Sequence, residues 1–210
     1  MSENYLERLP QALRKTGVHE RGEIELLPPD ESGRYGIVYE DKFVLLIRDR
    51  VRFPDGNEGG YLRLVNQGEL DGSAGAVMIP VWKGAVIFIR IFRHATRDWE
   101  WELPRGFHEA GLSEVENATK EIKEELGVDA VAARKIGSFN ANTGMLTGLI
   151  GVYAVDLAAN PLDSGTPQAA EGIGQFKSVA KSELPAFIAK VGLRCGISLA
   201  ALMLYTNDTK

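Results

Sequence analysis

The segment from Ser113 to Gly127 constrains the fold most, because its pattern predicts a helix whose two ends are both marked. Ser113 and Glu116 form an S-x-x-E capping box at the start, and Gly127 is the residue type that most often follows a helix. Apolar residues recur between these ends at spacings of three or four: Val115, Ala118, Ile122 and Leu126. We therefore expect one face of this helix to pack in a core.

The rest of the chain predicts strands in two groups. Residues 1–72 hold a short amphipathic helix over residues 3–15 and then three β-rich runs, Tyr35–Tyr39, Phe43–Ile47 and Tyr61–Val65. Residues 73–210 hold six further runs, a polar loop at 158–172 that we expect to be mobile, and two closing helices. The runs are Ala76–Val81, Ala85–Phe92, Trp99–Leu103, Lys135–Phe139, Leu149–Leu157 and Phe176–Ala180. Regular βα alternation is missing, so we predict an α+β fold in which a small antiparallel sheet precedes a second domain.

The predicted helix also carries a pair of stacked acids. Glu121 and Glu125 are four residues apart, which places their carboxylates one turn above each other, and Lys120 is spaced to pair with Glu124. Carboxylate oxygens are the ligands that Mg²⁺ and Mn²⁺ prefer. From the helix alone, a solvated acidic surface is the alternative interpretation.

The charge of the chain is concentrated on this segment. The 24 basic and 29 acidic residues give a net charge of −5, and residues 106–127 alone carry six acids and two lysines, or −4. Such a balance argues against a nucleic-acid binder, which normally shows a basic face. A single cysteine excludes an internal disulfide and a cysteine-based zinc site. We see no signal peptide and no apolar run of membrane-spanning length, so we expect a cytoplasmic protein.

The sequence around the helix resembles the Nudix hydrolase family. The motif of that family is Gly, five residues, Glu, seven residues, Arg-Glu, an apolar residue, any residue, Glu-Glu, any residue, Gly and an apolar residue. The matching positions are Gly106, Glu121, Ile122, Glu124, Glu125, Gly127 and Val128. Two positions depart: Leu112 stands where the family has its first Glu, and Lys120 where it has Arg. Because lysine lacks the planar fork of arginine, a glutamate next to it is expected to be held less rigidly.

The resemblance implies a Nudix-type α/β/α sandwich with a mixed sheet in residues 73–210, and it implies site residues. The family's metal ligands map onto Glu121, Glu125 and the main-chain carbonyl of Arg105. Glu124 matches a third acid, which orients a ligand, joins a further metal or acts as base. These residues imply a bound Mg²⁺, with Mn²⁺ as the other option.

Further resemblance points to the ADP-ribose pyrophosphatase branch. The IFRH segment at residues 91–94, the ELPRG segment, the N-terminal sheet and the closing SLAALMLY helix look like that branch. Its members are commonly homodimers in which the N-terminal sheet helps to shape the partner's substrate pocket. The proline that this branch carries beyond the motif is missing, since the corresponding segment is Asn142-Thr143-Gly144. That difference leaves other nucleotide sugars as competing substrates.

The resemblance also suggests substrate-binding and basic groups. Arg93 matches an arginine near the phosphates, Arg97 follows it, and Arg52 is a candidate for reaching across a homodimer. Each has the alternative of an ordinary surface charge. Glu171 is the loop glutamate best placed to act as general base, with Glu124 as the second choice.

Three functions follow from these observations as hypotheses. The first is Mg²⁺-dependent hydrolysis of ADP-ribose or a related nucleoside diphosphate derivative to AMP, or another nucleoside monophosphate, and a sugar phosphate. The second is a pyrophosphatase for other nucleotide sugars. The third is a catalytically weak nucleotide-binding module.

Trp99 and Trp101 alternate with Glu100 and Glu102, so we expect the tryptophan face to pack in the core or at a dimer interface.

Overall fold

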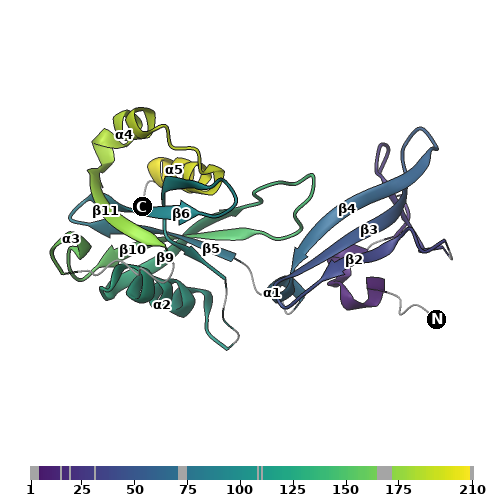
Figure 1. Ribbon diagram of the computed structural model, residues 1–210, viewed down its shortest axis with the longest axis horizontal. Helices are drawn as coiled ribbons and strands as arrows, with labels where there is room; N and C mark the ends of the chain where they lie inside the picture. The colour runs from purple at the N-terminus through teal and green to yellow at the C-terminus, as the bar shows by residue number, and fades with distance from the viewer. Residues whose placement is uncertain are drawn as a thin grey trace. The chain divides into compact units, whose positions relative to one another are not determined.

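The computed structural model describes residues 5–14, 16–18, 20–30, 32–70, 75–107, 109, 111–164 and 172–208. The chain forms two compact units (Figure 1). Unit 1 comprises residues 1–74 and 142–148, and unit 2 comprises residues 75–141 and 149–210. None of the described helices is both long and apolar enough to span a membrane.

Unit 1 is built on an antiparallel sheet centred on one long strand. Strand β3 (Val44–Arg52) pairs along its whole length with β4 (Glu58–Asn66), and its other edge pairs with β1 (Glu25–Leu27) and β2 (Gly36–Glu40). Alternate residues of β3 are buried, as expected for a sheet with one covered face. The short helix α1 (Gln67–Leu70) follows β4. The core of the unit consists of Tyr5, Leu6, Leu9, Leu45, Ile47 and Val65.

The N-terminal helix predicted over residues 3–15 is wrong. The described part of this segment forms two short 3-10 turns, η1 (Tyr5–Arg8) and η2 (Gln11–Arg14). Pro10 lies between them, and a proline interrupts a longer helix because it has no N–H to donate. The first turn is held to the sheet through Tyr5, whose hydroxyl donates to Asp49 at 2.7 Å, and Asp49 in turn pairs with Arg63.

Unit 2 contains a mixed sheet, as predicted, and its described strands number seven, one more than the six predicted runs. The order is β11 (Ile173–Ala180), β6 (Ala85–Arg93), β5 (Gly75–Trp82), β10 (Ile150–Leu157) and β9 (Ala130–Phe139). The short strands β7 (Asp98–Glu102) and β8 (Arg105–Gly106) pair with β6 and β5. Among the described strands of this sheet, β5 and β10 run parallel and the other pairs are antiparallel. Strands β5 and β6 pair with each other near the turn that connects them. Away from this turn, β6 pairs with β7 and β5 pairs with β8.

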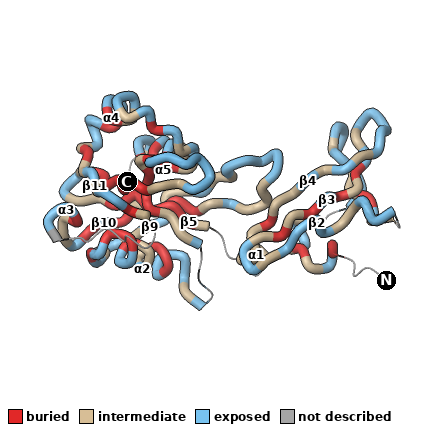
Figure 2. The backbone as a smooth tube through the Cα atoms, viewed as in Figure 1, coloured by how far each residue is buried: buried red, intermediate tan, exposed pale blue. Residues whose placement is uncertain are grey.

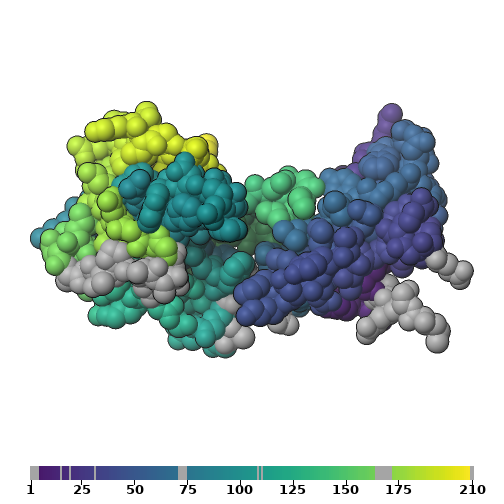
Figure 3. Space-filling model, viewed as in Figure 1, coloured from purple at the N-terminus to yellow at the C-terminus, as the bar shows by residue number. Residues whose placement is uncertain are grey.

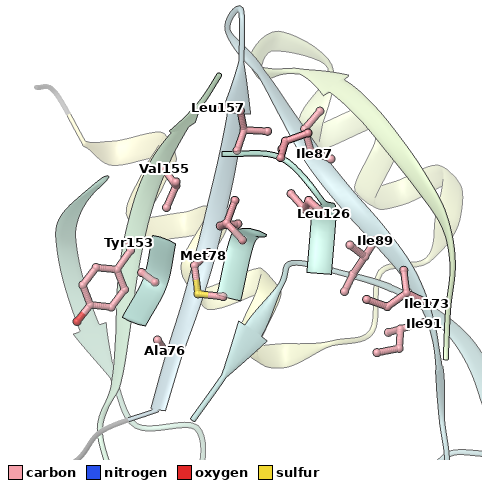
Figure 4. Packing of buried hydrophobic residues seen from close by; sticks show 13 residues of the cluster. Ala76, Met78, Ile87, Ile89, Ile91, Leu126, Tyr153, Val155, Leu157 and Ile173 are labelled. Carbon is pink, nitrogen blue, oxygen red and sulfur yellow. The ribbon is translucent and has the colours of Figure 1, made fainter. Parts of the chain in front are cut away.

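Helices cover both faces of this sheet, which gives the three-layer α/β/α arrangement (Figure 1). Alternation along β6 separates the two cores, because Ile87, Ile89 and Ile91 face helix α2 (Glu114–Leu126) while Val86 and Phe88 belong to the other core (Figure 4). That second core includes residues of α4 (Leu184–Val191) and α5 (Gly196–Asn207). The central strands are the most buried part of unit 2 (Figure 2). The remaining short helices are α3 (Pro161–Ser164) and η4 (Lys181–Glu183).

Helix α2 begins and ends where the sequence predicts. The hydroxyl of Ser113 accepts the N–H of Glu116 and the Glu116 carboxylate accepts the N–H of Ser113, while Gly127 adopts a left-handed φ of 71°. One residue of the predicted core face differs: Val115 is 40% exposed. It lies in the first turn, whereas the buried positions begin two residues later at Asn117.

On strand β7 the acidic residues are more buried than Trp99, so Trp99 does not pack in the core, and the dimer-interface alternative stays a prediction. Glu100 and Glu102 are the buried residues, and Trp99 is 42% exposed. The acids tolerate burial because each is paired with arginine: Glu100 with Arg194 at 2.6 Å, and Glu102 with Arg93 at 2.6 Å. Trp101 is half-buried and contacts the ring of Phe187.

The connection between β9 and β10 leaves unit 2 and belongs to unit 1. Residues 142–148 lie beside β4 (Figure 3). Leu64 of β4 donates its N–H to the carbonyl of Met145 and forms a bridge with Leu146. The loop predicted at residues 158–172 contains α3, and residues 165–171 lie outside the described part of the chain.

Candidate functional site

Glu121 lies directly against the backbone of Gly106. A Cβ placed on Gly106 would lie 2.1 Å from Glu121 Oε1, so any side chain at this position would collide with the carboxylate. Gly106 is held in strand β8, opposite Ala76 of β5, while Glu121 projects from α2. The glycine of the motif therefore provides the space into which the helix carboxylate fits.

Glu125 lies one turn further along and reaches the neighbouring residue of β8. Its Oε1 accepts the N–H of Arg105 at 3.3 Å, and the residue is 4% exposed. Two predicted ligands on α2 thus approach two consecutive residues of the same strand. The spacing of Glu121 and Glu125 predicts that their carboxylates lie one turn apart on α2, and Arg105 is the third ligand that the resemblance implies.

These residues fit a hard divalent cation. Two carboxylates and a main-chain carbonyl provide the oxygen donors that Mg²⁺ takes, with water completing its coordination. Gly106 has no side chain of its own to collide with the Glu121 carboxylate. Among the described residues no group of three or more His, Cys, Asp or Glu side chains is arranged to hold a metal, so the candidate set depends on the carbonyl of Arg105 as its third donor.

Arg93 is fixed by Glu102, a residue that the sequence did not single out for this role. Nη2 of Arg93 lies 2.6 Å from Glu102 Oε2, and its Nε donates to both carboxylate oxygens at 3.1 Å. Burial acts to lower the pKa of Arg93, but the hydrogen bonds and charge of Glu102, together with Cys195 and Glu125, raise it overall. Arg93 therefore carries a permanent positive charge, and the negative charge of Glu125 contributes to its raised pKa.

The loop between β8 and α2 is held by Asn117, a role that the sequence pattern does not indicate directly. The Asn117 amide is 1% exposed; its Nδ2 donates to the carbonyl of Phe107 at 3.2 Å and its Oδ1 accepts the N–H of Glu109 at 2.9 Å. Lys120 pairs with Glu109 and, as predicted, with Glu124 at 3.5 Å. The sequence signal for the role of Asn117 was a polar residue at a buried position of an otherwise periodic helix.

The other predicted residues lie elsewhere or outside the description. Arg97 stacks over Phe92 and contacts Nδ1 of His94 at 2.9 Å. Phe92 and Trp99 are paired residues of β6 and β7. Side chains alternate between the two faces of a sheet along each strand, so Arg93 and Glu102 lie on the other face from this pair. Arg97 therefore contacts the face opposite to that of Arg93 and Glu102. Arg52 belongs to unit 1, where it pairs with Glu25 and Glu58. Glu124 is an exposed partner of Lys120, and Glu171 is outside the described residues.

Comparison with solved structures finds a crystal structure described as an ADP compounds hydrolase. The two share 15% sequence identity with a TM-score of 0.69, over 90% of this chain and 95% of the other. The fold is a Nudix-type fold. At this level of identity, the likeness concerns the arrangement of helices and strands. Neither a protein-family model nor a curated protein sequence matches the chain.

Proposed function

We propose that the protein hydrolyses the pyrophosphate bond of ADP-ribose or a related nucleoside diphosphate derivative, with Mg²⁺ or Mn²⁺ as cofactor. The observation that carries this proposal is the approach of Glu121 to Gly106 and of Glu125 to the Arg105 amide. Of the three predicted metal ligands, Arg105 belongs to β8, and Glu121 and Glu125 belong to α2 next to it. The expected products are AMP, or another nucleoside monophosphate, and a sugar phosphate.

The chain's own residues divide the remaining work. A bound divalent cation would polarise the phosphoryl oxygens and lower the pKa of a water molecule. Arg93, fixed on Glu102, is suited to bind the phosphate oxygens because its guanidinium offers several donors in one plane. Glu124 and Glu171 remain the candidate bases. The likeness to a structure described as an ADP compounds hydrolase supports the substrate class.

A substrate panel with a single matched variant tests the proposal. The full-length protein is incubated with ADP-ribose, nucleotide sugars and dinucleotides in Mg²⁺, and an added phosphatase converts the monoester products to measurable phosphate. Glu125→Gln keeps an oxygen that can accept the Arg105 N–H but removes the charge. We expect it to reduce turnover at least about 100-fold. The melting temperature in EDTA should stay unchanged or rise slightly, because repulsion from Glu121 is relieved.

The matched control is Glu183→Gln, a change of the same kind in η4 of the same unit. It should leave turnover within twofold of the wild type. The proposal is contradicted if no member of the panel is hydrolysed in a metal-dependent manner, or if Glu125→Gln retains wild-type turnover. Ligand binding without turnover would support the nucleotide-binding module instead.

A further inference from the structure

Two arginine side chains meet one buried carboxylate at the end of β7. Arg93 donates hydrogen bonds to Glu102 from Nε and Nη2, and Nη2 of Arg105 lies 3.4 Å from Glu102 Oε2. The side chain of Glu102 is only 4% exposed, whereas those of Arg93 and Arg105 are 28% and 32% exposed. The carboxylate therefore lies beneath two cations that reach the surface.

The cluster has more positive charge and more donors than Glu102 alone uses. Two guanidinium groups and one carboxylate sum to a single positive charge. Nη1 of Arg93 takes no part in its hydrogen bonds to Glu102, and the contact of Arg105 with the carboxylate is an ion pair at Nη2. A planar guanidinium matches the oxygens of phosphate as well as those of carboxylate. The remaining edges of both groups are thus suited to an anion with several oxygens.

Stability alone gives a weak reason for this arrangement. Removing a carboxylate from water is costly, and the attraction of a buried ion pair often repays little more than that cost. The position of the cluster is more informative. The main chain of Arg105 donates to Glu125, so the same residue that borders the candidate metal ligands sends its side chain to Glu102.

We infer that Arg105 is a second phosphate-binding residue, which forms with Arg93 a clamp for the diphosphate group of the substrate. Glu102 holds both guanidinium groups in place. This inference rests on the proposed function, since it assigns the clamp to the same diphosphate. It gives the Arg105 side chain a role separate from its main chain, which an alanine substitution leaves intact.

Inorganic pyrophosphate in EDTA probes the clamp without metal or hydrolysis. Isothermal titration calorimetry on the full-length protein should detect binding, and Arg105→Ala and Arg93→Ala should each raise the Kd about 10-fold through loss of charge-assisted hydrogen bonds. Arg105→Lys should lose less, because lysine keeps the charge without the fork. Arg134→Ala is the matched control, since Arg134 pairs with Asp208 and lies on β9. It should bind pyrophosphate as the wild type does.

Several results would overturn the clamp. These are a wild type that does not bind pyrophosphate, an Arg105→Ala variant within twofold of the wild-type Kd, or an equal loss in the Arg134 control. Melting curves show whether Arg105→Ala remains folded, and Arg105→Lys preserves the test if it does not. Pyrophosphate binding that depends on Arg105, in a protein that hydrolyses no member of the panel, contradicts the proposed function alone. If a member of the panel is hydrolysed but the Kd for pyrophosphate does not depend on Arg105, the clamp alone is contradicted.

Discussion

At the scale of single residues, the site depends on a glycine whose missing side chain makes room for a carboxylate. Gly106→Ala adds a methyl carbon that would lie 2.1 Å from the present position of Glu121 Oε1. Because Gly106 is paired with Ala76 in the sheet, the helix carboxylate has to move rather than the strand. We expect turnover of the best substrate to fall on the order of 100-fold, as a displacement of about 1 Å in a catalytic group can cause.

Gly196→Ala is the control for this change. A Cβ on Gly196 meets no atom within 4 Å, and the residue begins α5, so the substitution should be neutral. Steady-state kinetics and circular dichroism on both variants separate a local effect from misfolding. Wild-type activity in a folded Gly106→Ala protein would show that the position of Glu121 is unimportant.

At the scale of elements, the cap of α2 fixes where the two metal-ligand candidates fall. Ser113→Ala removes a side-chain N-cap, which typically costs about 1 kcal/mol of folding free energy and about 2–4 °C of melting temperature in a chain of this size. Ser182→Ala, an exposed serine of η4, should have little effect. A melting temperature of Ser113→Ala equal to that of the control would mean that packing alone sets the start of the helix.

The same cap gives a pH dependence with a definite sign. Hydrogen bonds from the Ser113 side chain and main chain lower the pKa of Glu116 below its usual value. A lowered pKa stabilises the fold above the unfolded pKa, and this contribution is lost as the pH falls through the folded pKa. Thermal melts should therefore show the difference between wild type and Ser113→Ala in full at neutral pH, and a smaller difference in the acid range below the usual glutamate pKa.

Local signals predicted elements well and side-chain partners poorly. The start and end of α2 follow from Ser113 and Gly127, since caps depend on neighbours in sequence. The roles of Glu102 and Asn117 depend on residues nine or ten positions away that the fold brings together, so periodicity did not reveal them. The N-terminal segment forms two short turns instead of one helix because Pro10 interrupts it, although its leucines recur at helical spacing.

At the scale of the whole molecule, the chain enters unit 1 a second time through residues 142–148. Glu69 of α1 is central to this return, because it accepts a hydrogen bond from Thr147 Oγ1 and another from Asn66 Nδ2, the latter at 2.5 Å. The N–H of Leu64 donates to Met145 and the carbonyl of Leu64 accepts from Thr147. This segment of seven residues is thus hydrogen-bonded to both β4 and α1.

Glu69→Ala should therefore loosen this segment while the hydrophobic cores of both units stay intact. Hydrogen bonds to a charged group contribute about 1.5–3 kcal/mol each, so their loss should speed amide exchange at Met145 and Thr147 by roughly 10- to 100-fold. Hydrogen-exchange mass spectrometry on the full chain measures the effect, and peptides from β6 should exchange as in the wild type. Glu20→Ala, an exposed residue of the same unit, is the matched control. Unchanged exchange at residues 145–147 would mean that the Leu64 backbone contacts alone hold the segment to β4.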